Sequence, residues 1–238
     1  MIPRVYRNCR FVAISPSTKV DLVRRGIQDK NVDVVYCGLD HDRYRIIDGL
    51  TRYEAPTIVH FGRMRKYKAI DMVIKAFARI REKLPNAKLV IIGDGPALTN
   101  LQSLSARLGL DEAIEFTGRM ETDKMVETLN RSHLFMNASP KEGWGLTVVE
   151  ANACGMPVIG SDRPGLRDSI LHKKTGFLVE YGDVEGLAAR ALELLTDGEL
   201  WERMSRAGLE WAQSMTWERT GQEMERLFLR DGLSQPTK

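Results

Sequence analysis

The feature that most constrains the fold is the alternation of short apolar runs with amphipathic segments along the chain. Residues 57–61, 88–92, 134–137 and 176–179 are apolar runs of strand length. Residues 68–84 place apolar side chains at the spacing of an amphipathic helix. This alternation predicts a doubly wound, Rossmann-like α/β fold, with a parallel sheet covered by helices on both faces. Ligands of such sheets bind beyond the carboxyl ends of the strands, so we expect functional residues there.

The remaining segments fit the same alternation. Residues 41–55 show no sustained period and are interpreted as a linker. Ser15 or Ser17 is expected to cap the first helix. Further strands are expected at 11–14, 32–36, 114–116 and 158–159, and further helices at 17–25, 122–129, 146–154, 183–195, 198–215 and 216–229, with another that ends near 108.

Charge is distributed unevenly along the 238 residues. Residues 1–90 hold 19 Lys and Arg against 9 Asp and Glu, whereas residues 91–238 hold 16 against 23. A basic first part favours an anionic partner, which could be a phosphorylated ligand, a membrane surface or nucleic acid. No nucleic-acid-binding motif is present, so we expect no nucleic-acid partner. The alternative interpretation is an ordinary solvated surface.

Composition favours a cytoplasmic protein, with contact at the inner face of a membrane as an option. The longest apolar runs are of strand length, and no secretory signal precedes them. The three cysteines, Cys9, Cys37 and Cys154, are scattered and are interpreted as free thiols. We expect no metal ion, because the four isolated histidines have no other ligand at metal-binding spacing: His41, His60, His133 and His172.

Two motifs could carry chemistry. In the first, Gly62 follows a strand and precedes Arg63 and Lys68, with a helix expected to begin near Lys68. A glycine, cations and a helix N-terminus together form a phosphate cradle. The second places Glu142 in a loop and Glu150 in a very apolar helix, where a carboxylate needs hydrogen-bond donors. A basic surface loop and a structural ion pair are the respective alternatives.

Two further turns are weaker candidates. Gly93, Asp94, Gly95 and Pro96 follow a strand like a dinucleotide fingerprint, but Leu98 stands where the third glycine belongs. A tight structural turn is the favoured interpretation. The loop 163–168 could close over a ligand. No Gly-x-Ser-x-Gly and no P-loop are present, which argues against the common hydrolases and NTPases.

Taken together, these motifs resemble the C-terminal half of the family-4 glycosyltransferases, which have the GT-B fold. The similarity runs through the whole chain, from residues 12–15 and 35–40, through Gly62, Arg63 and Lys68, to residues 116–118, 142–150 and 153–159. It implies an enzyme that moves a sugar from a nucleotide-diphosphate sugar to an acceptor with retention of configuration, without a cofactor or a divalent metal. The donor would be linked to UDP, GDP or ADP, and the acceptor would be a carbohydrate or glycolipid.

The resemblance also implies roles for individual residues. Arg63 and Lys68 would hold the diphosphate as it leaves, Glu142 would bind the transferred sugar, and Glu150 would bind the ribose. Two departures matter. Ala69 replaces a usual glycine, which could alter the loop without removing its charges. Pro164 replaces the first of a usual glycine pair and leaves Gly165, which puts the contacts of that loop in doubt. Other implied donor contacts are Gly62, Gly118, Arg119, Met120, Gly145, Leu146, Thr147 and Gly165.

The resemblance further implies an incomplete enzyme. Residues 1–48 would be the end of an N-terminal acceptor domain plus a hinge, and residues 49–238 the donor domain with a C-terminal crossover helix. We therefore expect an exposed apolar surface near 5–36 and 217–229, which the missing half would cover. A binding module without turnover, which would need a separate acceptor subunit, is the alternative, and a Rossmann dehydrogenase is a distant third.

Overall fold

The centre of the molecule is a six-stranded parallel sheet. The computed structural model describes residues 5–6, 8–230 and 232. Its large sheet has the strand order β5-β4-β3-β6-β7-β8, so the order reverses between β3 and β6. The strands are β3 (Thr57–Phe61), β4 (Lys88–Ile92), β5 (Ile114–Gly118), β6 (Leu134–Asn137), β7 (Val158–Ser161) and β8 (Gly176–Val179).

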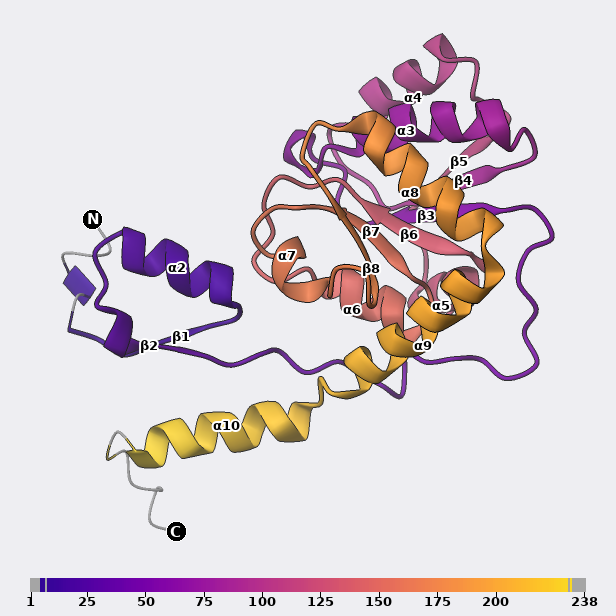
Figure 1. Ribbon diagram of the computed structural model, residues 1–238. Helices are drawn as coiled ribbons and strands as arrows, with labels where there is room; N and C mark the ends of the chain where they lie inside the picture. Colours follow the sequence, from indigo (N-terminus) through magenta and orange to yellow (C-terminus); the bar gives the residue numbers. More distant parts are fainter. Residues whose placement is uncertain (1–4, 7, 231, 233–238) are drawn as a thin grey trace.

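Helices cover both faces of this sheet, which confirms the predicted fold class (Figure 1). Successive residues of β3 explain the two cores, because Ile58 joins the cluster under α3, α4 and α8, while Val59 joins the one under α5 and α6. Helix α9 packs on α6. The helices are α3 (Ile70–Lys83), α4 (Leu98–Arg107), α5 (Thr122–Arg131), α6 (Leu146–Ala153), α8 (Val184–Thr196) and α9 (Gly198–Gln213).

A small N-terminal unit stands beside the main sheet. Strands β1 (Phe11–Ala13) and β2 (Val32–Val34) pair in parallel, and α2 (Pro16–Arg24) connects them. Ser15 caps α2 by accepting a hydrogen bond from the backbone N–H of Thr18. A 3₁₀ turn (Asp29–Asn31) precedes β2. The segment between β2 and β3 then passes α9 and reaches β3 through turns, without helix or strand, as expected for a linker (Figure 1).

The last helix, α10 (Trp217–Arg230), returns to this N-terminal unit. The Thr220 hydroxyl donates to the carbonyl oxygen of Tyr36 at 2.8 Å, and Arg230 forms an ion pair with Asp33 at 2.7 Å. Apolar side chains in both segments are exposed, including Val5 and Trp217. Exposed apolar side chains therefore occur in both of the expected regions, and their cover by another domain stays a prediction.

Two local features differ from the expectations. Helix α3 begins at Ile70 rather than at Lys68, because Lys66–Lys68 form a 3₁₀ turn and Ala69 adopts a left-handed φ of 50°. An alanine in that region is strained by its Cβ, which explains the preference for glycine there. The loop 163–168 contains a short helix, α7 (Leu166–Ser169). In the described part of the chain, no helix is long and apolar enough to cross a membrane.

Candidate active site

Two loops meet where the strand order reverses. The loop 62–69 leaves the end of β3, and the loop 138–145 leaves the end of β6. These strands are neighbours in the sheet, although about seventy residues separate them in sequence. Both loops therefore project from the same edge, at the position where doubly wound sheets bind their ligands.

An ion pair joins the two loops. The Lys68 ammonium lies 2.6 Å from Oε1 and 2.7 Å from Oε2 of Glu142. The side chains are only 16% and 13% exposed, so both charges are largely removed from water. Breaking such a pair leaves a charge that is largely removed from water and has no partner. Lys68 therefore needs Glu142 or an anionic ligand group, and Glu142 needs Lys68 or hydrogen-bond donors of a ligand.

Arg63 lies on the same loop as Lys68 but faces solvent. Its guanidinium donates to the Tyr67 hydroxyl at 3.4 Å, and it lines an open depression with Arg65, Lys66, Tyr67 and Pro96. Arg63 is therefore free to turn toward an incoming anion, whereas Lys68 is already held in place.

The Gly93–Gly95 turn packs against the backbone of the loop 62–69. A Cβ at Gly93 would overlap the carbonyl oxygen of Gly62, and one at Gly95 would overlap that of Met64. The backbone N–H of Met64 also donates to Asp94 O at 2.8 Å. The two glycines thus allow close packing of backbones, which agrees with the interpretation as a structural turn.

Glu150 lies in α6 beside the side chain of Tyr44. Burial raises the pKa of Glu150 to about 7, and the Tyr44 hydroxyl partly opposes that rise. Burial and the nearby Glu150 carboxylate raise the pKa of Tyr44. Among the described residues, no Lys or Arg forms an ion pair with Glu150. The structure therefore gives no support to the structural-ion-pair alternative, and Glu150 can still accept hydrogen bonds from a ligand.

The start of α6 faces the same region as Glu142. Gly145 precedes the helix with a φ of 91°, a backbone conformation that glycine adopts without strain. The backbone N–H groups of Leu146 and Thr147 belong to the first turn, where an α-helix has no internal acceptors for them. They provide partial positive charge a few residues after Glu142.

Gly165 contacts the loop that carries Glu142. A Cβ on Gly165 would overlap the carbonyl oxygen of Glu142 and lie 2.7 Å from its Cβ. The backbone N–H of Glu142 donates to Pro164 O at 2.9 Å. In this geometry Gly165 positions Glu142 through backbone packing, so its expected role in donor binding is indirect.

Gly165→Ala is expected to destabilise the protein by about 2 kcal/mol or more, because a φ of 86° strains alanine and its methyl group displaces Glu142. Urea unfolding measures this change. Gly182→Ala is the matched control, since Gly182 has a φ of 100° but no atom within 4 Å of an added Cβ. Gly182→Ala should lower the free energy of unfolding only by the cost of backbone strain. Equal losses in the two variants would contradict the contact with Glu142.

A cleft of about 610 Å³ separates α2 from the Glu142 and Gly165 loops. The Ser15 and Thr18 hydroxyls donate to Gly143 O at 2.6 and 3.1 Å, which ties the N-terminal unit to the Glu142 loop. Glu142 lines this cleft and contacts Lys68 on the other side. It therefore lies between the basic loop and the cleft.

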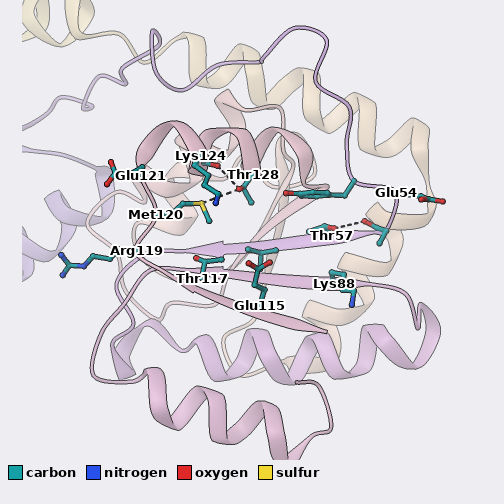
Figure 2. Close-up of a pocket in the computed structure, with 13 residues that line it drawn as sticks. Glu54, Thr57, Lys88, Glu115, Thr117, Arg119, Met120, Glu121, Lys124 and Thr128 are labelled. Carbon is teal, nitrogen blue, oxygen red and sulfur yellow. Dashed lines mark hydrogen bonds between the residues drawn. The ribbon is translucent and has the colours of Figure 1, made fainter. Parts of the chain in front are cut away.

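A separate groove of about 570 Å³ lies on the sheet face beside α5 (Figure 2). Of the donor contacts that the resemblance implies, only Arg119 and Met120 line this groove. Arg119 points away from the other labelled side chains, whereas Met120 accepts a weak hydrogen bond from Thr128 at 3.7 Å (Figure 2). Lys68 and Glu142 do not line this groove, so it is distinct from the candidate site.

Comparison with known proteins identifies the family. The model of the glycosyl transferases group 1 family matches residues 45–211. The chain belongs to this family. The group 1 domain covers the whole of the large sheet, including both loops of the candidate site.

Curated glycosyltransferases resemble the chain over most of its length. It is 33% identical over 197 residues to N-acetyl-alpha-D-glucosaminyl L-malate synthase of Bacillus anthracis, covering 83% of the chain and 50% of that protein. It is also 33% identical over 191 residues to a GDP-mannose-dependent phosphatidylinositol monomannoside mannosyltransferase of Mycobacterium tuberculosis, covering 73% of the chain and 49% of that protein. The chain thus spans about half the length of these relatives.

Solved GT-B glycosyltransferases share the fold. HepE of Anabaena, crystallised with UDP and glucose, superimposes with a TM-score of 0.85 at 21% identity, covering 94% of this chain and 66% of HepE. TarM of S. aureus, crystallised with UDP among other ligands, gives a TM-score of 0.79 at 19% identity, covering 91% and 43%. These matches confirm that the group 1 chain has the C-terminal half of a GT-B fold.

The structure adds two residues to those expected at the candidate site of this group 1 chain. Tyr44, beside Glu150, lies in the segment interpreted as a linker. His60 is buried at the end of β3, where its Nδ1 donates to Met136 O at 2.9 Å and its Nε2 has no partner among the described residues. Burial lowers its pKa to about 4, so this imidazole is neutral. An isolated histidine in an apolar strand carries no sequence signal of such a position.

Proposed function

We propose that this group 1 glycosyltransferase chain binds a nucleotide-diphosphate sugar and supplies the donor site for sugar transfer with retention of configuration. The observation that carries the proposal is the Lys68–Glu142 ion pair at the reversal of the strand order. The Lys68 ammonium is suited to a diphosphate, and the Glu142 carboxylate beside it is suited to sugar hydroxyls. These two parts are neighbours in a nucleotide-diphosphate sugar.

The charges of the site fit the proposed chemistry. Breaking the sugar–phosphate bond builds negative charge on the departing diphosphate. Lys68, Arg63 and the N-terminus of α6 supply positive charge at that position, so transfer is proposed to need no divalent metal and no cofactor. Glu142, held by Lys68 until the ligand arrives, would then accept hydrogen bonds from the sugar.

The cleft between α2 and the Glu142 loop is the proposed entrance of the acceptor. It opens next to Glu142, where the sugar would lie, and α2 forms its other wall. A second domain would contribute further acceptor contacts, since the chain spans only about half of its curated relatives.

A panel of UDP-, GDP- and ADP-sugars tests the donor proposal. Titration calorimetry in the presence of EDTA should show binding of one nucleotide class, and a coupled assay should show slow hydrolysis of the same donor. The names of the relatives make UDP- and GDP-sugars the first choices. Absence of binding across the panel would contradict the proposal. Binding without hydrolysis, and without transfer in the presence of an acceptor domain, would favour the alternative of a binding module.

Glu142→Gln is expected to tighten the binding of nucleoside diphosphate alone by about threefold to tenfold. In the empty site the diphosphate must compete with Glu142 for Lys68, and the hydrogen bond that has to be broken contributes about 1 kcal/mol net. The preference for the nucleotide sugar over the nucleoside diphosphate should fall about tenfold, because a charged hydrogen bond to the sugar is lost.

Calorimetry on the variant and on Glu193→Gln measures both effects. Glu193 is a suitable control because it pairs with Arg190 on the exposed face of α8, away from the site. Weaker binding of the nucleoside diphosphate to Glu142→Gln would show that Glu142 does not compete for Lys68.

A further inference from the structure

A second basic surface adjoins the candidate site. A groove of about 500 Å³ runs between α3 and α4, and its near end is formed by Arg65 and Lys66 of the loop that carries Lys68. The open depression beside Arg63 shares these two residues with it. The two hollows thus form one continuous surface, here called the α3–α4 groove, outside the Lys68–Glu142 pair.

The rim of the α3–α4 groove is strongly cationic. Asp71 is the one acidic residue among the described residues that line it, and Asp71 pairs with Lys75 at 2.8 Å. In the described structure, Arg65, Lys66 and Arg107 have no ion pair. The cations that line the two hollows are Arg63, Arg65, Lys66, Lys75 and Arg107.

The floor of the groove is apolar. Tyr67 lines the adjoining depression and is 47% exposed, and Leu108, directly after Arg107, is 41% exposed. Aromatic side chains with one polar end favour the boundary between water and hydrocarbon. The floor is formed by Ile70, Pro96, Ala97, Leu101 and Leu104.

We propose that the α3–α4 groove binds an anionic membrane lipid, with the cations around its headgroup and the apolar floor under the adjoining hydrocarbon. A cationic rim over an apolar floor matches an amphiphile with a negative head. A nucleic acid would instead need a basic track with aromatic side chains for stacking, and the described lining residues include one aromatic residue, Tyr67. An acidic protein segment would leave the floor without an apolar partner.

This contact would orient the chain on a membrane. Arg65 and Lys66 lie two or three residues from Lys68, so a lipid held there keeps the loop 62–69 close to the membrane surface. The candidate site would then open toward molecules at that surface. The groove shares Arg63 with the candidate site, so the test of the lipid contact substitutes Arg65 and Arg107, which have no part in the proposed sugar transfer.

Cosedimentation with vesicles tests the proposal. The full chain should bind vesicles of phosphatidylcholine with about a third phosphatidylglycerol, and should bind pure phosphatidylcholine weakly, with the difference reduced at high salt. Arg65→Glu combined with Arg107→Glu should weaken binding at least about 25-fold, since each cation near an anionic surface contributes a factor of about five. Arg203→Glu with Arg206→Glu, on exposed positions of α9, changes the net charge equally and should retain binding.

Each remaining outcome decides the question. An equal loss of vesicle binding in both double variants would show only an effect of net charge and would contradict a lipid site in the α3–α4 groove. Binding of glycerol phosphate in calorimetry as tight as vesicle binding would assign a free phosphate instead of a lipid. Tighter binding to an oligonucleotide than to vesicles would assign a nucleic acid. Circular dichroism checks that each variant is folded. If Arg65→Glu with Arg107→Glu unfolds, the charge-neutral variant Arg65→Gln with Arg107→Gln takes its place.

Discussion

Lys68→Ala is expected to weaken the binding of nucleoside diphosphates about 30-fold or more. Glu142 holds the ammonium near the site in the empty protein, and the ammonium then exchanges this carboxylate for the more highly charged diphosphate. A hydrogen bond to a charged group contributes about 2 kcal/mol, which corresponds to this factor. The effect should shrink at high salt because the contact is ionic. Calorimetry measures it, with Lys83→Ala at the exposed end of α3 as the control.

The same substitution should also lower the free energy of unfolding. Removing Lys68 leaves the Glu142 carboxylate 13% exposed and without its partner, which costs up to about 3 kcal/mol. Lys68→Ala with Glu142→Gln should recover most of that stability, because the unpaired charge is gone, but should not recover nucleotide binding. A double variant that binds nucleotide as tightly as the original chain would refute the role of Lys68.

Glu150→Gln is expected to make the protein more stable and less able to bind nucleotides. Burial raises the pKa of Glu150 from 4.5 to about 7, so the folded protein holds this proton more tightly than the unfolded chain. The contribution to stability is fully present below about pH 4.5 and is lost as the pH rises through 7. The loss amounts to about 3 kcal/mol above about pH 7.

The amide that replaces the Glu150 carboxylate does not titrate, so the variant should match the original chain near about pH 4 and exceed its stability by up to about 3 kcal/mol near about pH 8. Urea unfolding at both pH values measures the difference, with Glu225→Gln on an exposed turn of α10 as the control. Binding of every ribonucleotide should weaken by about tenfold, because an ionised Glu150 would accept hydrogen bonds from the ribose. A variant less stable at high pH would contradict a half-buried carboxylate that has no ion pair among the described residues.

The sequence was sufficient to predict the layers of the fold because burial on two faces leaves a strong pattern. Ile58 and Val59 are both apolar and point to opposite cores, which is why β3 forms a continuous apolar run. Loop conformations were harder to predict. Ala69 carries no signal of a left-handed φ, so the sequence predicts a start of α3 two residues too early.

The contact at the centre of the site could not be predicted from sequence order. Lys68 and Glu142 are 74 residues apart, and they meet because β6 pairs with β3 after β4 and β5 have been added on the other side. The family resemblance implies a separate ligand group for each residue but gives no sign that the two bind each other in the empty site. Likewise, Tyr44 reaches Glu150 from a segment without periodicity, which only the folded chain reveals.

A crystal structure with the nucleoside diphosphate that binds most tightly is the decisive measurement. We expect Lys68 to leave Glu142 and contact the diphosphate, Arg63 to turn toward the same phosphates, and the ribose to lie against Glu150. Density for the nucleotide in the groove of Figure 2, with the Lys68–Glu142 pair intact, would contradict this assignment.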